Sequence, residues 1–118
     1  MFLPSLFNLT STTEYCQYAY GVTPRPFWGP TYYGAQNLQA ASNIVFSNGQ
    51  LDPWRGGGVQ QNISDTVVAI IIEDGAHHLD LRAPDPRDPP SVTAARAQEA
   101  QHIQRWIQEA FVRRRKQL

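Results

Sequence analysis

The chain has 118 residues and a mass of 13.3 kDa, which suits one domain and is too short for two. Apolar residues make up 42%, and Lys+Arg 10 balance Asp+Glu 10, which excludes wholesale disorder and a net field that would attract nucleic acid or an anionic membrane. No apolar run approaches the ~20 residues of a membrane span, and the first residues lack the charge pattern of a signal peptide. We therefore expect neither nucleic acid nor a membrane among the partners.

Residues 1–42 are rich in aromatic residues, proline and threonine, and Glu14 and Arg25 are their only charges. This composition predicts a mostly irregular, packed segment with one helical turn near Cys16. A single cysteine is either a buried thiol or one half of a disulfide whose partner lies outside the chain. The glycosylation sequons at Asn8 and Asn62 favour the second interpretation, because both features are typical of the secretory pathway.

Two short apolar runs in residues 43–82 predict strands. Residues 43–47 end at the turn dipeptide Asn48-Gly49, and residues 66–72 are rich in β-branched residues, apolar throughout and end at Glu73-Asp74-Gly75. Roughly twenty residues separate the runs, which is too many for a hairpin and enough for a crossover between parallel strands. Continuous apolarity favours burial of both faces, as in a parallel sheet covered by helices on each side.

Residues 91–115 predict one long helix. Pro89 and Pro90 block a helix upstream, and Ser91 is the expected N-cap. The basic residues 113–116 lie at its C-terminal end, where cations oppose the negative pole of the helix dipole; phosphate binding and a targeting signal are the alternatives. Apolar residues recur at spacings of three and four and form one stripe: Ala100, Ile103, Trp106, Ile107, Ala110 and Phe111.

Two strands and one helix cannot cover a strand that is buried on both faces and both edges. The expected fold class is therefore α/β, with this chain forming one end of a larger α/β domain.

Polar residues follow each predicted strand. Asp52 comes after the first strand, and His77 and His78 come after the second, so parallel strands would carry them to the same edge of the sheet. A carboxylate that holds one ring nitrogen leaves the other to take a proton from a hydroxyl, and the order acid then histidine matches α/β-hydrolases. The alternative is an aspartate that caps a turn and a histidine pair satisfied on a loop. A metal site that includes Asp80 is not expected, because the short cluster lacks the usual ligand spacing.

The sequence lacks a recognisable nucleophile. None of its serines lies in the Gly-x-Ser-x-Gly turn that exposes a catalytic hydroxyl, and Cys16 has no such turn either. We therefore expect the 118-residue chain alone to be inactive. The serines are Ser5, Ser11, Ser42, Ser47, Ser64 and Ser91.

Residues 43–54, 56–58 and 75–82 resemble the C-terminal part of the proline-specific serine exopeptidases, the family of the lysosomal Pro-X carboxypeptidases and dipeptidyl peptidase 2. The resemblance runs from about Met1 to Ile107. It implies that residues 43–118 are the C-terminal part of an α/β-hydrolase core and that residues 1–42 are the end of its helical cap. The chain would then be a fragment, about a quarter of such an enzyme, without the serine turn.

The same resemblance implies a serine peptidase that hydrolyses peptide bonds next to proline and needs no metal or other cofactor. Asp52 would be the triad acid, His77 the general base and His78 a supporting residue. Trp54 would either wall a proline-sized pocket or anchor the core beneath the Gly56–Gly58 turn. A lysosomal or secreted location agrees with the sequons. Carboxypeptidase activity, aminodipeptidase activity and an inactive fragment stay open, as does a homodimer of the full-length protein.

Overall fold

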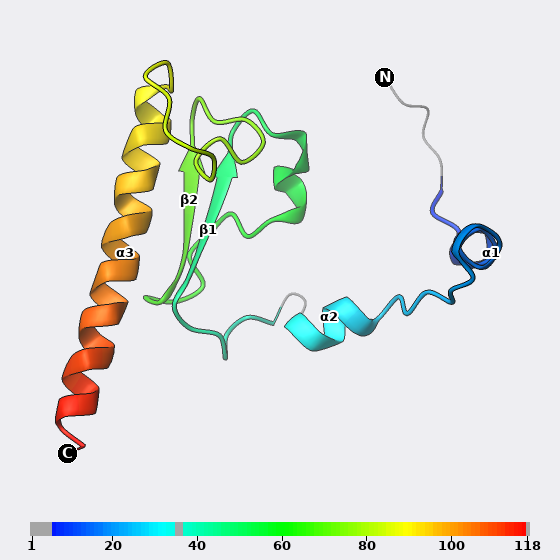
Figure 1. Ribbon diagram of the computed structural model, residues 1–118, viewed down its shortest axis with the longest axis horizontal. Helices are drawn as coiled ribbons and strands as arrows, with labels where there is room; N and C mark the ends of the chain where they lie inside the picture. The colour runs from blue at the N-terminus through cyan, green and yellow to red at the C-terminus, as the bar shows by residue number, and fades with distance from the viewer. Residues whose placement is uncertain (1–5, 35–36, 118) are drawn as a thin grey trace. The chain divides into compact units, whose positions relative to one another are not determined.

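The computed structural model describes residues 6–34 and 37–117. The chain divides into two compact units, Met1–Asn37 and Leu38–Leu118, and each is described by itself. Figure 1 shows the helices of the first unit in blue and cyan, and the sheet and long helix of the second unit in green to red.

The N-terminal unit contains more helix than its composition predicts. The helix α1 spans Leu9–Tyr20, whereas we expected one turn around Cys16. The side chain of Asn8 accepts a hydrogen bond from the backbone N–H of Ser11, and Gly21 ends the helix in the left-handed conformation with φ 64. These caps satisfy backbone groups at both ends, which stabilises a helix built from residues of modest helix propensity.

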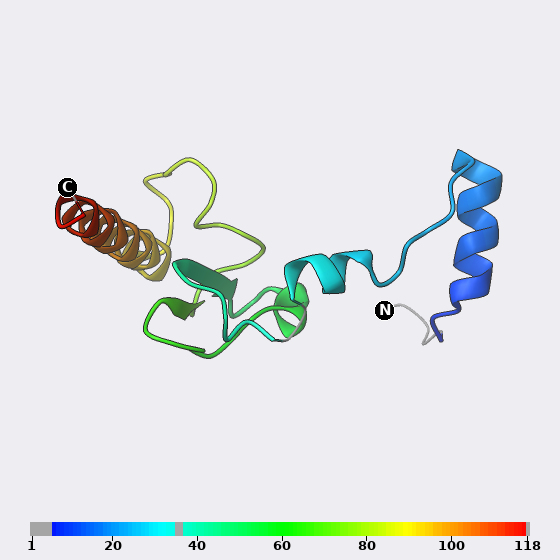
Figure 2. The ribbon, with the colours of Figure 1, turned by 90° about the horizontal axis from the view of Figure 1, so that it is seen from below.

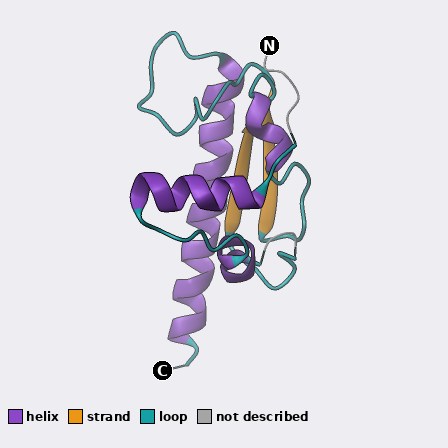
Figure 3. Cartoon of the chain, turned by 90° about the vertical axis from the view of Figure 1, so that its right-hand side faces the viewer, coloured by secondary structure: helices purple, strands orange, loops and turns teal. Residues whose placement is uncertain are grey.

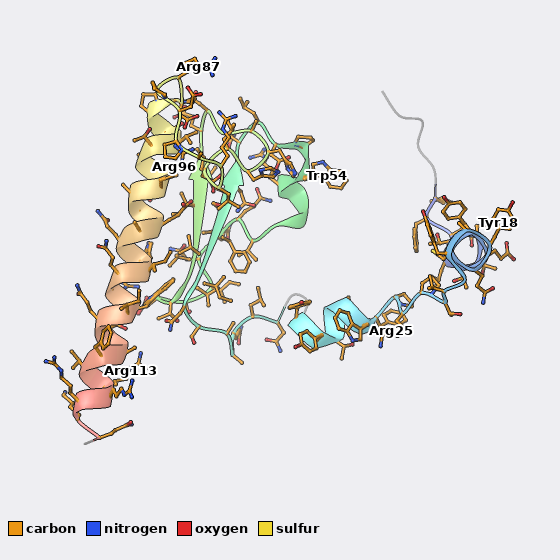
Figure 4. All side chains as sticks on the ribbon, in the orientation of Figure 1. Tyr18, Arg25, Trp54, Arg87, Arg96 and Arg113 are labelled. Carbon is orange, nitrogen blue, oxygen red and sulfur yellow. The ribbon has the colours of Figure 1, made fainter. Side chains whose placement is uncertain are left out.

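The short helix α2, Trp28–Tyr33, carries an aromatic cluster. Trp28 stacks on Tyr32 with ring centroids 5.1 Å apart, and the guanidinium of Arg25 lies 5.3 Å from the centroid of the same indole. Arg25 is labelled in Figure 4. The described part of residues 1–42 therefore contains two helices, α1 and α2, rather than one helical turn.

The second unit contains a parallel pair of strands, which confirms the pairing expected from the sequence. The strand β1 spans Ile44–Gly49 and β2 spans Val67–Ile72, in register from Ile44 opposite Val67 to Gly49 opposite Ile72. Both arrowheads point the same way in Figure 1. The turn predicted at Asn48-Gly49 is wrong, because pairing with β2 keeps these residues in the strand.

The helix α3 spans Pro90–Arg115 and begins one residue earlier than expected. Its N-cap is Pro89 rather than Ser91. Pro90 occupies the first helical position, which suits proline because its φ is already helical and its missing N–H would have no partner there. The Ser91 hydroxyl instead donates to the carboxylate of Asp74 at 3.0 Å and accepts the backbone N–H of Asp74 at 3.3 Å. Ser91 therefore ties the helix to the turn after β2.

The core lies between α3 and one face of the sheet, and Figure 2 shows the helix on that side. Buried residues of β2 and of the first turns of α3 form it: Ile70, Ile72, Val92 and Ala95. Ile71 points to the other face and is 42% exposed, so the expected burial of both faces is not met along the whole strand.

The helix α3 continues past the strands, as Figure 3 shows. Its 26 residues span about 39 Å, whereas six strand residues span about 20 Å. The predicted apolar stripe is consequently buried only in part: Trp106 is 7% exposed, but Ile107 is 50% and Phe111 62% exposed. A groove of about 470 Å³ separates this part of α3 from the start of β1. Among the described residues, no helix has the length and apolarity that crossing a membrane requires.

Candidate active site

The loops that follow β1 and β2 lie in close contact at the carboxyl end of the sheet. The backbone N–H of Leu51 donates to the carbonyl of Gly75 at 2.9 Å, and that of Gln50 donates to the carbonyl of Ile72 at 2.8 Å. A Cβ atom on Gly49 would lie only 2.5 Å from the Gly75 carbonyl oxygen and would also overlap the Ala76 carbonyl. Glycine at position 49 is therefore what allows the two loops to approach.

This approach brings Asp52 and His77 together. The carboxylate Oδ2 of Asp52 lies 2.9 Å from Nδ1 of His77. The other oxygen, Oδ1, accepts the backbone N–H of Trp54 at 2.9 Å and caps the 3₁₀ helix η1, Pro53–Gly57. Asp52 therefore both caps a turn, through Oδ1, and contacts the histidine, through Oδ2.

The hydrogen bonds around Asp52 favour its charged form. The bond from His77 lowers the pKa of the Asp52 carboxyl below its usual value, and the Trp54 N–H lowers that pKa further. The Asp52 side chain is 12% exposed and the His77 side chain 60%. Because Nδ1 faces the carboxylate, Nε2 is the ring nitrogen left to exchange a proton with a third group.

His78 lies beside His77 in an unusual backbone conformation. The two ring centroids are 4.2 Å apart with planes tilted by 55°, and His78 has a φ of 42. Left-handed φ is uncommon for residues other than glycine and requires support from surrounding contacts. One such contact runs from the backbone N–H of Leu81 to the His78 carbonyl at 3.2 Å.

Behind this loop lies an acidic cluster that the sequence did not indicate. Asp80 is only 6% exposed and accepts the hydroxyl of Ser47 at 2.6 Å. Burial, followed by the charge of Asp80, raises the pKa of Glu99, and its Oε1 is buried without a hydrogen-bond partner in the described structure. Asp80 belongs to the histidine motif that the sequence singled out. Glu99 lies on α3, and no motif or spacing in the sequence pointed to it. Across residues 6–34 and 37–117, no group of three or more His, Cys, Asp or Glu side chains is placed to hold a metal ion.

Trp54 does not anchor the core. Its side chain is 76% exposed and points away from the sheet in Figure 4, which excludes an anchor beneath the Gly56–Gly58 turn. The remaining interpretation, an apolar wall for a proline ring, stays a prediction.

The asparagines predicted to carry glycans are exposed, and the cysteine predicted to form a disulfide is half-buried. Asn8 and Asn62 are both exposed, and Asn62 Oδ1 accepts the backbone N–H of Ala69 at 2.8 Å. Cys16 lies on α1 as a free, half-buried thiol. A fully buried thiol is thereby excluded, and the disulfide stays a prediction.

Comparison with known proteins identifies relatives of most of the chain. Lysosomal Pro-X carboxypeptidase of Bos taurus is 49% identical over 116 residues, which are 98% of this chain and 23% of that protein. The Homo sapiens protein of the same name is 50% identical over 111 residues, covering 94% of this chain and 22% of the relative. Thymus-specific serine protease of Mus musculus is 29% identical over 101 residues, or 81% of this chain and 20% of the relative.

The chain thus spans less than a quarter of the length of these relatives. The profile of the serine carboxypeptidase S28 family matches residues 9–99, which include both loops of the Asp52–His77 pair. The chain belongs to the serine carboxypeptidase S28 family.

Proposed function

We propose that this chain supplies the acid and the general base of a serine peptidase that cleaves peptides next to proline. Asp52 is the acid and His77 the base, and the reactive serine lies on polypeptide outside these 118 residues. The observation that carries the proposal is the 2.9 Å contact between Asp52 Oδ2 and His77 Nδ1 at the carboxyl end of a parallel sheet.

The chemistry follows from which ring nitrogen is engaged. Nε2 of His77 takes the proton of the serine hydroxyl as its oxygen attacks the peptide carbonyl, and Asp52 stabilises the imidazolium that results. The same nitrogen then gives the proton to the leaving amine. Water repeats the sequence on the acyl-enzyme and releases the second product, which restores neutral His77.

The relatives' names support the substrate class. Those reported above include two Pro-X carboxypeptidases, so we propose carboxypeptidase action on a peptide with proline before the scissile bond. An aminodipeptidase has no support among these names. We assign Trp54 to the proline pocket and His78 to a supporting role, because both flank the acid–base pair in sequence.

The larger architecture is also a proposal. Residues 43–118 form the C-terminal part of an α/β-hydrolase core, and residues 1–42 form the end of its cap. The parallel pair β1–β2 with the acid and base loops at its carboxyl end supports this placement. We propose a lysosomal location, since the relatives are named lysosomal, with glycans on Asn8 and Asn62 and a disulfide from Cys16.

A chimera tests the function directly. The matching segment of bovine lysosomal Pro-X carboxypeptidase is replaced by this chain, and hydrolysis of a peptide with a Pro-X C-terminus is measured. We expect activity, and we expect Asp52→Asn or His77→Ala to lower kcat/KM by about 1,000-fold or more. His102→Ala is the matched control, because it also removes an imidazole, but one that lies on α3 beside Trp106 rather than against Asp52.

Two results would overturn the proposal. A folded, glycosylated chimera that hydrolyses no Pro-X peptide would show that this chain cannot complete the enzyme. Full activity of His77→Ala, with loss in His78→Ala instead, would transfer the role of base to the neighbouring histidine.

A further inference from the structure

Arg96 of α3 reaches the backbone of the histidine loop. Its Nε donates to the carbonyl of Asp80 at 2.8 Å, and its Nη2 donates to the carbonyl of Leu79 at 2.8 Å and to that of Arg82 at 3.4 Å. One guanidinium therefore holds three carbonyls of the segment that directly follows His77 and His78. Figure 4 shows Arg96 on α3 beside this loop.

Asp88 holds Arg96 in that position. Its Oδ2 lies 2.7 Å from Nη1 of Arg96, and its Oδ1 accepts Nη2 of Arg82 at 2.9 Å. The Asp88 side chain is 1% exposed and also accepts the backbone N–H of Asp85 at 2.9 Å. These hydrogen bonds keep the pKa of the Asp88 carboxyl far below its usual range, so Asp88 faces Arg96 as a carboxylate at any physiological pH.

The histidine loop needs such support. It belongs to no strand or helix, and the left-handed φ of His78 is a conformation that other contacts must maintain. The His77 side chain is 60% exposed, so packing contributes little to its orientation. A shift of the following carbonyls would therefore turn the imidazole relative to Asp52.

We propose that Arg96, fixed by Asp88, is a positioning residue that sets the His77 imidazole against Asp52. This inference rests on the proposed function of His77. Lysine cannot replace the arginine, because an ammonium group lacks the planar fork that reaches the loop carbonyls and a carboxylate together. The hydrogen bonds of Arg96 go to loop carbonyls and to Asp88, not to His77 or Asp52, so its effect on His77 runs through the backbone.

The test begins with the histidine side chains of the full 118-residue chain, observed by long-range ¹H–¹⁵N NMR. Wild type should show His77 with its proton on Nδ1, as the bond to Asp52 requires. Arg96→Lys should give a mixture of tautomers or exchange broadening at His77. Arg105→Lys is the matched control, since Arg105 lies on the same helix and donates to the distant Asp65 carbonyl at 2.9 Å.

The same two variants are then compared in the chimera with bovine Pro-X carboxypeptidase. Arg96→Lys should lower kcat by about 10- to 100-fold and leave KM unchanged, because misplacement of a catalytic group weakens the reaction step. Arg105→Lys should leave both constants as in wild type. Asp88→Asn is a second variant for the same measurements, because it removes the charged partner of Arg96 and keeps the arginine itself.

The failures are distinguishable. If His77→Ala is active, the proposed function fails. If His77→Ala is inactive while Arg96→Lys and Asp88→Asn keep the wild-type His77 signals and kcat, the positioning role of Arg96 is wrong. If Arg96→Lys does not fold, the signals and kcat of Asp88→Asn decide in the same way.

Discussion

Asp52 is held from two sides before any substrate binds. The Trp54 N–H donates to Oδ1 at the start of η1, and the His77 ring contacts Oδ2, so each carboxylate oxygen has its own partner. The lowered pKa of Asp52 means that the native state favours its ionised form. This contribution to stability is present above the ordinary carboxyl pKa and is lost only as the pH falls through the lowered value. The Asp52 carboxylate therefore stays ionised at mildly acidic pH.

Gly49 has a different task, since it sets how closely the two loops approach. We predict that Gly49→Ala destabilises the chain by about 1–3 kcal/mol, because the new Cβ must displace backbone carbonyls rather than a flexible side chain. Urea unfolding of the 118-residue chain gives the change in free energy. NMR should also show loss of the Nδ1-bound proton signal of His77.

Gly57→Ala is the control for this prediction. Gly57 lies in η1, and a Cβ there meets nothing within 4 Å, so its effect should stay within about 0.5 kcal/mol. Equal destabilisation by both substitutions would mean that the close approach at Gly49 does not decide the geometry of the site.

Between elements, α3 and the histidine loop meet through charged groups as well as through the apolar core. Glu99 faces Asp80 where the helix covers the loop, and burial raises the pKa of Glu99. The native state therefore binds a proton more tightly than the unfolded chain does. Stability must then fall as the pH rises from the ordinary glutamate pKa, about 4.3, through the raised value.

We predict that Glu99→Gln removes this loss. The amide stays uncharged beside Asp80, so the variant should be more stable than wild type at pH 7 and should vary less between pH 5 and pH 7. Urea midpoints at these two values measure both effects. Glu109→Gln, at an exposed position of the same helix, should follow wild type. If the urea midpoint of Glu99→Gln at pH 7 equals that of wild type, the charged form of Glu99 does not destabilise the native state and the prediction is wrong.

The sequence allowed the regular elements of the second unit to be predicted because local patterns determine them. The apolar run of β2 and the periodic residues of α3 are visible without any neighbour, and the long separation of the strands implied parallel pairing. The turn predicted at Asn48-Gly49 was wrong because β2 pairs with both residues. The extent of α1 was missed because its caps, Asn8 and Gly21, stand beside residues of low helix propensity.

The residues of the candidate site also fall into those that could be predicted from the sequence and those that could not. The contact between Asp52 and His77 could be predicted because each lies in the loop after a strand, and parallel strands carry such loops to one edge. Arg96 and Glu99 could not, because each is one polar residue in a helix whose sequence shows nothing of the loop it meets. Their roles depend on how residues 79–88 fold back onto α3, which is a tertiary property.

On the scale of the whole molecule, this chain matches less than a quarter of the length of these relatives and still brings Asp52 and His77 into contact. The contacts that assemble the pair lie within residues 49–77, and those that tie the loop to α3 lie within residues 74–96. Large apolar residues toward the end of α3 stay exposed, Ile107 and Phe111 among them. The chain thus combines an internally formed site with an incompletely covered helix.

We predict that the 118-residue chain by itself is inactive and forms no adduct with a fluorophosphonate, a reagent that labels activated serines. Ser47, the serine in β1, donates its hydroxyl to the buried carboxylate of Asp80 rather than to an imidazole, so it has no base positioned as in a triad. Intact-mass spectrometry should show an unmodified chain, whereas the chimera with bovine Pro-X carboxypeptidase should be labelled under the same conditions. A stoichiometric adduct on Ser47, abolished by His77→Ala, would place the nucleophile within this chain and overturn the assignment of the reactive serine to polypeptide outside it.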